Sequence, residues 1–547
     1  MNKLIPFFYK LFLSLTVLLF CISALVIYRA DKVIKNQITK FIQSSVNNNP
    51  KSIYKVELGE IDIKIFQGNV NLTNIKLSPK VIDSTIKSKH IYAIVQIKSL
   101  IVQNLNWYNI IFKNTELATK KIEIINPQID LFINKNGIKN KTTKDFDFEN
   151  LILKNNIDLT FEEISVKNVN LSVLNSTREN VKIFSIEDFS INVKELSITP
   201  ETIKKTNFPF LISDLTAGSG KISYHLRNDY KLEIGDFHYN LKKDKLRLNK
   251  LQYTNILTLK GYKKHFTDDS PYYKISVHEI NLPVKRIDFD RFYYQIPIVK
   301  IDSLNVLVFQ SKKREIRSPK IKPTLNESLG NIGAPILINQ IQLSNCDFVY
   351  QFSESNTIDR VATVSFNKAN VTIDNFTTID TLAKKNPFLE ISAQCKFMNK
   401  ANLTIEAKYN LSSKKEEHQI NAELSNFKLS HLNNTIAALA PVKIKKGMAH
   451  SAKIKYNANK KEAKGTIDLH YTDLWIEVIK NEEKHKQYGI VSLVVNNILK
   501  KNNIPDTPNY KQGKIDCKSD PNKSILNYMW GCVKSGLKSS ISRSKKK

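Results

Sequence analysis

Residues 122–131, IEIINPQIDL, and residues 164–173, ISVKNVNLSV, share a ten-residue pattern that decides the fold of this chain. Apolar residues occupy its first, third, eighth and tenth positions, and Asn occupies the fifth. Such alternation is typical of strands with one apolar and one polar face. The five-residue step from the third to the eighth position would flip the apolar face of an unbroken strand. We therefore predict a bulge or tight bend at the central Asn, which tolerates the left-handed conformation.

The same pattern recurs along the chain, with Ser or Lys at the centre of two copies. The copies that begin at 122 and 164, and those at 299 and 341, are 42 residues apart, and the copies at 341 and 364 are 23 apart. This spacing predicts internal repetition with a unit of about 21 residues, two strands and a turn. The alternative is chance in a chain rich in Ile, Asn and Lys. The central residues are Asn126, Asn168, Ser303, Asn345 and Lys368, with Asn74 in a partial copy.

Alternation with a period of two covers most of the chain after residue 50, for example at 61–65, 403–411 and 474–478. We expect a mostly β fold: after the membrane helix described next, an elongated, curled antiparallel β-sheet groove (a β-taco) with a few capping amphipathic helices. A sheet with an apolar face must close on a second sheet or curl into a trough that shelters apolar ligands. The residues expected to line this groove and contact lipid are Ile122, Ile124, Ile129, Leu131, Leu171, Val173, Phe348, Tyr350, Leu403 and Ile405.

An uncharged apolar run at residues 11–28 predicts a single transmembrane helix within an anchor at 1–30. As a helix the run is about 27 Å long, close to the ~30 Å hydrocarbon core of a bilayer. The alternative is a cleaved signal peptide, which would end in small residues rather than in a bulky stretch such as Val26–Tyr28. Residues 31–48 then predict an amphipathic helix, which either caps the sheet or lies at the membrane interface. Its apolar stripe is Ile34, Ile38, Phe41 and Ile42.

The chain has 547 residues and a formal net charge of +32, and residues 484–547 carry 14 basic residues against three acidic ones. A basic balance fits an anionic membrane surface or a nucleic acid, and solubility alone is the other interpretation. Residues 484–547 predict a basic helical tail with a second membrane-interface stripe: Met529, Trp530, Val533 and Leu537. A disulfide between Cys517 and Cys532 is left open by the sequence.

The sheet is expected in two segments, at residues 51–311 and 334–480. Between them, residues 312–335 concentrate Pro319, Pro323, Gly330, Gly333 and Pro335, the clearest break in the alternation.

Catalytic and metal-binding motifs are incomplete. His278–Glu279 begins like H-E-x-x-H, but Leu282 stands where the second His belongs. Gly218–Lys221 resembles a phosphate loop only in letters, because Ile222 replaces the Ser or Thr that would hold magnesium. We therefore expect no enzyme, no cofactor and no metal site. Nucleic-acid binding is the least favoured interpretation, because basic and aromatic residues do not interleave.

Three stretches resemble the AsmA-like family, within the bridge-like lipid-transfer proteins. They are YKVELGEIDIKIFQGNVNLTNIKLSP at 54–79 after the two predicted helices, the late block at 429–479, and SILNYMWGCVKSGLK at 524–538. The resemblance covers about a fifth of the chain and transfers no catalytic residue. It implies a single-pass inner-membrane protein of diderm bacteria, with its bulk in the periplasm, that takes part in phospholipid traffic and envelope integrity.

Two functions follow as expectations. The first is a hydrophobic groove that carries glycerophospholipid between inner and outer membrane, with the outer membrane or one of its proteins as partner at the carboxy-terminal end. The alternative is a membrane-anchored scaffold or assembly factor for outer-membrane proteins, which would bind partners at exposed sheet edges.

Overall fold

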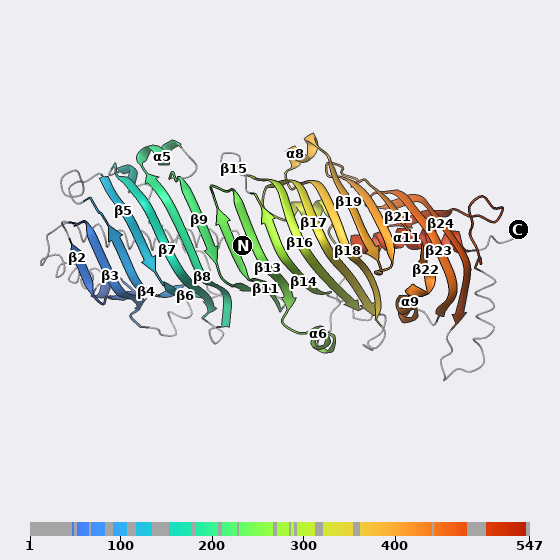
Figure 1. Ribbon diagram of the computed structural model, residues 1–547, viewed down its shortest axis with the longest axis horizontal. Coiled ribbons are helices and arrows are strands. Elements are labelled where there is room, and N and C mark those ends of the chain that lie inside the picture. Colours follow the sequence, from blue (N-terminus) through green and yellow to red (C-terminus); the bar gives the residue numbers. More distant parts are fainter. Residues whose placement is uncertain are drawn as a thin grey trace. The chain divides into compact units, whose positions relative to one another are not determined.

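Twisted β-strands, several of them 16–19 residues long, dominate the computed structural model of this protein (Figure 1). The structure describes residues 46–48, 52–64, 67–81, 91–106, 116–133, 152–154, 156–176, 181–205, 210–226, 229–265, 271–283, 286–288, 293–311, 321–353, 361–439, 442–478 and 499–542. The predicted anchor and the predicted helix at 31–48, with Ile34, Ile38, Phe41 and Ile42, lie outside these residues apart from their last three positions. Within them, no helix has the length and apolar character needed to cross a membrane.

Contacts divide the chain into two compact units. The first unit is residues 1–228 with 232–248, and the second is residues 229–231 with 249–547. The strands β11 (Tyr230–Ile234) and β13 (Lys245–Asn255) contain the points of division. The predicted break at 312–335 lies inside the second unit, because the strands before and after it pair with one another.

In the first unit the strands pair side by side into a sheet, and the short helix α5 (Pro200–Lys205) follows β8. Its strands are β1 (Tyr54–Glu57), β2 (Ile61–Lys64), β3 (Asn69–Pro79), β4 (Tyr92–Gln103), β5 (Glu116–Ile125), β6 (Gln128–Ile133), β7 (Asp158–Asn175), β8 (Val181–Ile198), β9 (Asp214–Ser219), β10 (Ile222–His225) and β12 (Asp236–Asn240).

In the second unit the strands also pair with their neighbours in chain order (Figure 1). Its strands are β14 (Tyr272–Leu282), β15 (Arg286–Asp288), β16 (Tyr293–Ser311), β17 (Ile336–Ser353), β18 (Ala362–Thr377), β19 (Phe388–Phe397), β20 (Ala401–Asn410), β21 (His418–Leu424), β22 (Phe427–Lys428), β23 (Val442–Ala458), β24 (Glu462–Val478) and β25 (Gly513–Lys518). Its helices are α6 (Leu259–His265), α7 (Leu325–Gly330), α8 (Asp380–Lys385), η4 (Leu429–Leu432), α9 (Asn433–Leu439) and α11 (Ile525–Ile541).

The central residue of every copy of the repeated pattern has a positive φ, as predicted. The angles are 49° at Asn74, 51° at Asn126, 55° at Asn168, 54° at Ser303, 53° at Asn345 and 50° at Lys368. In β7, Ile164 and Val166 before the bend and Val169 and Val173 after it belong to the same apolar cluster. The left-handed residue therefore keeps the apolar side chains on one face across the five-residue step.

Side chains of the neighbouring strand hold these bends in place. The Asn168 N–H donates to Ser190 Oγ at 3.0 Å, and the Asp188 N–H donates back to Asn170 Oδ1 at 3.1 Å. In the second unit the Asn345 N–H donates to Asn370 Oδ1, and the Lys368 N–H donates back to Asp347 Oδ1. Each bonded side chain stands two residues after the bend of its own strand. Backbone groups that the bend removes from the sheet ladder are thus satisfied.

Copies that begin 42 residues apart are parallel neighbours in the sheet. Ile122 pairs with Ile164 between β5 and β7, and Val299 pairs with Ile341 between β16 and β17. The prediction of an antiparallel sheet is therefore wrong at these two places and at the β6–β7 pair, although pairs such as β7–β8 and β17–β18 are antiparallel. The physical reason is the connection between the copies. A crossover segment carries the chain back before the second copy begins, so the second strand runs in the same direction as the first and pairs beside it.

Candidate functional site: the apolar band of the sheet

Cross-strand pairing in the second unit brings apolar residues into two neighbouring rows that run together from β16 to β25. We call these two rows the apolar band. The first row is Val299, Ile341, Ile373, Ile391, Ala407, Ile420, Tyr456, Gly465 and Ile515, and the second is Ile280, Ile301, Leu343, Val371, Ala393, Ile405, Ala422, Ile454, Ile467 and Gly513. In these rows the Tyr456 hydroxyl is the single polar side-chain group.

The row between these two, which faces the other side of the sheet, is polar throughout. It runs from Lys300 on β16 to Lys514 on β25, through Gln342, Thr372, Ser392, Glu406, Asn421, Lys455 and Thr466. The second unit therefore separates its two faces by chemistry over nine strands, as a sheet with one face toward water does.

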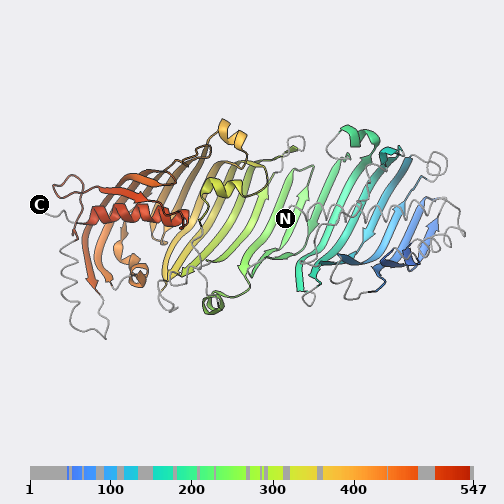
Figure 2. The ribbon, with the colours of Figure 1, turned by 180° about the vertical axis from the view of Figure 1, so that it is seen from behind.

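One end of the apolar band is covered by α11, which lies across the strands on the apolar face (Figure 2). The helix turns Tyr528, Cys532, Gly536 and Ser540 toward the sheet, and Cys532 is fully buried. Gly536 permits the close approach, because a Cβ there would lie 2.6 Å from the side chain of Ile467. At this end Ile467 and Ile515 have no exposed surface, and burial raises the pKa of Tyr456, so its phenol is neutral.

Away from α11 the band is only half buried. Ile341, Ile373, Ile391, Val371 and Ile405 on β17 to β20 keep part of their surface accessible. Apart from α11, the helices of the described part of this unit have no more than seven residues. The middle of the apolar band thus presents accessible apolar side chains without any charge among them.

The first unit repeats this arrangement with its own rows. One row is Ile61, Leu72, Leu100, Ile124, Val166, Ile191, Ala217 and Tyr239, and another is Ile63, Val70, Val102, Ile122, Ile164, Val193 and Leu215. Many of these side chains are buried, for example Leu72 and Leu100. Toward β8 and β9 the rows are half buried, as at Ile191, Val193, Leu215 and Ala217, so both units present accessible apolar side chains.

All ten residues predicted to line a groove lie on these apolar faces. Ile122, Ile124, Ile129, Leu131, Leu171 and Val173 are on the apolar face of the first unit, and Phe348, Tyr350, Leu403 and Ile405 are on that of the second. Ile124, Leu131, Val173 and Leu403 are buried, whereas the other six are half buried. Burial raises the pKa of Tyr350, whose hydroxyl donates to Gln310 Oε1 at 3.1 Å.

Ile391 and Ala393, the band residues on β19, were not among the residues predicted to line the groove. The signal was present, because residues 389, 391, 393, 395 and 397 are apolar or Cys and alternate with polar residues. The sequence analysis also missed β25, which lies in a stretch that reads as part of a helical tail but pairs with β24.

The residues of the predicted membrane-interface stripe on the last helix lie in two different environments. Met529, Val533 and Leu537 pack against the apolar cluster of the second unit, whereas Trp530 is 53% exposed. Cys517 and Cys532 are free thiols in hydrogen-bonding contact, and burial raises the pKa of Cys532.

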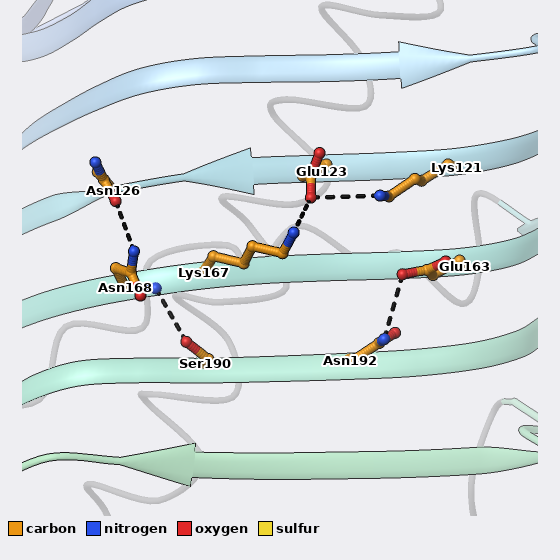
Figure 3. A network of polar contacts seen from close by, with 8 residues as sticks. All are labelled: Lys121, Glu123, Asn126, Glu163, Lys167, Asn168, Ser190 and Asn192. Atoms are coloured by element: carbon orange, nitrogen blue, oxygen red, sulfur yellow. Dashed lines mark hydrogen bonds and ion pairs between the residues drawn. The ribbon is translucent and has the colours of Figure 1, made fainter.

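A polar network marks the opposite face of the first unit (Figure 3). Lys167 on β7 forms an ion pair with Glu123 on β5 at 2.5 Å, and Lys121 approaches the same carboxylate at 3.3 Å. Hydrogen bonding to Lys167, which outweighs desolvation, lowers the pKa of Glu123. Asn168 Nδ2 donates to Asn126 Oδ1 at 3.0 Å, which links the bends of two parallel strands.

No protein-family model matches the chain, and a search of curated proteins finds no match. The resemblance to the AsmA-like family therefore stays a prediction from the sequence.

Proposed function

We propose that this protein holds glycerophospholipid acyl chains along the apolar band, and that as a membrane-anchored AsmA-like protein it passes them between inner and outer membrane. The observation that carries the proposal is the unbroken pair of apolar rows from β16 to β25, half accessible over β17 to β20. An accessible apolar face of this extent marks a site for an apolar ligand or partner.

Energetics favour acyl chains as the ligand. Moving a lipid tail through water costs about 0.8 kcal/mol for each CH₂ group, and an apolar wall removes most of that cost. Nine strands from β16 to β25, spaced about 4.8 Å apart, make the band roughly 38 Å long. This exceeds the ~15 Å that one leaflet of a bilayer's hydrocarbon core occupies. The four strands β17 to β20, over which the band is half accessible, span roughly 14 Å, which is about the length of one tail.

The test is lipid retention by the full chain, purified in a mild non-ionic detergent and measured by mass spectrometry of extracted lipid. Two aspartates on β19, Ile391→Asp with Ala393→Asp, place charge in the middle of the apolar band, where both native side chains are half buried. We expect this variant to lose most of the bound phospholipid, because an ionised carboxylate is costly to bury beside acyl chains.

The matched control is Ser392→Asp with Gln394→Asp, which adds the same charges to the same strand on its exposed polar face. It should retain lipid as the unaltered chain does. Ile391→Asn is a milder variant in case the double aspartate unfolds, and circular dichroism reports on folding. An unaltered protein without phospholipid, or equal lipid loss in the control, would contradict the proposal.

A further inference from the structure

The polar face of the first unit contains an open depression of about 490 Å³ at the side of the network in Figure 3. Its floor follows from strand register. Ser165 on β7 pairs with Asn192 on β8, Asn192 with Thr216 on β9, and Thr216 with Asn240 on β12. Cross-strand pairs point to the same face of a sheet, so these four polar side chains form one row across four strands.

The neighbouring row explains why the surface is hollow there. Gly218 on β9 pairs with Ser190 on one side and with His238 on the other. A Cβ on Gly218 would lie 3.2 Å from Nδ1 of His238, so the missing side chain makes room both for the imidazole and for a ligand. Ser190 Oγ accepts the Asn168 N–H, which leaves its hydroxyl proton available to donate.

The rim of the depression is basic. Lys243, Lys245 and Arg247, from the turn after β12 and the start of β13, line it together with His238 and Lys167. His238 lies 3.4 Å from Asp236, and Lys167 is paired with Glu123. Within the described ranges, none of Lys243, Lys245 and Arg247 has a carboxylate within ion-pair distance, so three positive charges converge without a partner.

Two acidic groups nearby contact other residues of the first unit. Glu163 Oε1 accepts a hydrogen bond from Asn192 Nδ2 at 3.2 Å, and Asp214 Oδ2 lies 3.9 Å from Lys242 Nζ. A third, Asp244, lies in the turn between Lys243 and Lys245, and after desolvation its charge is the second cause that raises the pKa of Tyr239. Basic groups still outnumber this carboxylate at the rim.

Two lining residues carry buried polar atoms without a hydrogen-bond partner in the described structure: Nε of Arg247, a donor, and Oδ1 of Asn192, an acceptor. A buried polar atom left unpaired costs about 1–3 kcal/mol. Both atoms have almost no exposed surface, so a ligand in the open depression contacts other atoms of these two half-buried side chains.

We propose that this depression binds a phosphorylated polyol of the glycerol phosphate class. The phosphate is held by Lys243, Lys245 and Arg247, and the hydroxyls by Asn192, Thr216 and Ser190. Guanidinium and hydroxyl donors are the usual partners of phosphate in proteins, and Asn oxygens are those of hydroxyls. The ligand is either a free polyol phosphate or the head group of a lipid such as phosphatidylglycerol. The inference does not rest on the proposed function, because the site lies on the polar face, in another unit.

The test uses the full chain in non-ionic detergent. Glycerol 3-phosphate and glycerol are titrated by calorimetry, and micelles that carry phosphatidylglycerol or phosphatidylcholine are compared in the same way. We expect saturable binding of glycerol 3-phosphate, of phosphatidylglycerol micelles or of both, without binding of glycerol or phosphatidylcholine. Binding of the soluble ligand alone assigns a free metabolite, and binding of the micelles alone assigns a lipid head group.

The double variant Lys245→Ala with Arg247→Ala should weaken this binding by about tenfold or more, because it removes charged hydrogen bonds. The matched control, Lys98→Ala with Lys182→Ala, removes the same charge at exposed positions outside the depression and should bind within about twofold of the unaltered chain. Gly218→Val fills the floor without changing charge and should also weaken binding.

The apolar-band variant, Ile391→Asp with Ala393→Asp, should bind glycerol 3-phosphate normally, which separates this site from the proposed lipid conduit. An absence of saturable binding to either ligand form would overturn the inference. Equal weakening in the charge-matched control would do the same, because it would show diffuse attraction rather than a site.

Discussion

A residue with a positive φ at the centre of the pattern lets the apolar positions of a strand change from even to odd, or from odd to even, while their side chains stay on one face of the sheet. Asn126 and Asn168 stand side by side on parallel strands, each with a positive φ, and an amide hydrogen bond joins them (Figure 3). Ser303 and Asn345 repeat the arrangement in the second unit, where Asn345 Nδ2 donates to Ser303 Oγ at 3.4 Å. The apolar rows on both sides of these residues stay on one face as a result.

A substitution at Asn168 tests this role. Asn168→Val and Asn168→Gly both lose the amide bond to Asn126, but Val adopts a positive φ at a steric cost and Gly does not. We expect the Val variant to have an opening free energy about 1–2 kcal/mol lower than the Gly variant at β7 and β8 amides. Native-state hydrogen exchange measures this difference. Equal protection in the two variants would show that the left-handed bend is dispensable.

The bends at the centres of the repeated pattern could be predicted from the sequence. The pattern around residues 126, 168 and 345 predicts the bend for two reasons. Asn is unusual at the centre of an apolar alternation, and the five-residue step would move the apolar side chains to the other face unless the strand bends. The left-handed residues Asp188 and Glu195 carry the same signal, which the search for Asn-centred copies overlooked. Residues 184–193, FSIEDFSINV, are a complete copy with Asp188 at the centre, and residues 191–198 are a partial copy around Glu195. Only pairing reveals that the bend at Asp188 faces the bend of β7, where its N–H donates to Asn170 Oδ1.

Among the elements, α11 decides how much of the apolar band is accessible. Its sheet-facing residues Cys532, Gly536 and Ser540 are small, so the helix lies close to β24 and β25. Leu526, Trp530, Lys534 and Lys538, each four residues from the next, face away from the sheet and are exposed. The helix covers the band at β23 to β25 and leaves it half accessible at β17 to β20.

Gly536→Ala tests this packing. The new Cβ would lie 2.6 Å from Ile467 and 2.9 Å from Ile515, so the helix must shift or the sheet must give way. We expect the helix to be destabilised against the sheet by about 1–3 kcal/mol. Hydrogen exchange of residues 525–541 and limited proteolysis would both increase. Lys534→Ala on the exposed stripe is the control, and an unchanged Gly536→Ala protein would contradict close packing of α11.

The existence of α11 follows from its sequence, but its orientation does not. The apolar positions Ile525, Met529, Val533 and Leu537 predict a helix with one apolar stripe. In the structure that stripe lies beside the band, while the more buried stripe consists of Tyr528, Cys532, Gly536 and Ser540. Gly and Ser are not strongly apolar, so a periodic pattern of hydropathy does not mark the helix face that they form. Such a face is buried because the helix lies close to the sheet, which the sequence does not show. The same limit hid the depression around Gly218, which depends on register between four strands.

For the whole molecule, the account holds that apolar side chains from many strands act as one binding surface in each unit. Alternation within a strand establishes the two faces, and pairing between strands aligns them into rows. The alternation within a strand can be read from the sequence, but the pairing between strands cannot. For this reason the ten predicted lining residues fall on the apolar faces, although the parallel pairs β5–β7 and β16–β17 and the strand β25 were not foreseen.

The central claim is that lipid tails lie on the apolar face of the second unit, which β17 presents on both sides of its bend. The most direct measurement is photo-crosslinking in cells, with a photoreactive amino acid placed singly at residues 341, 342, 348, 349, 350 and 351. The account predicts phospholipid adducts at odd-numbered Ile341 before the bend and at even-numbered Phe348 and Tyr350 after it, with none at Gln342, Val349 and Gln351. Adducts on both faces alike, adducts that keep one parity across Asn345, or no lipid adducts at all would contradict it.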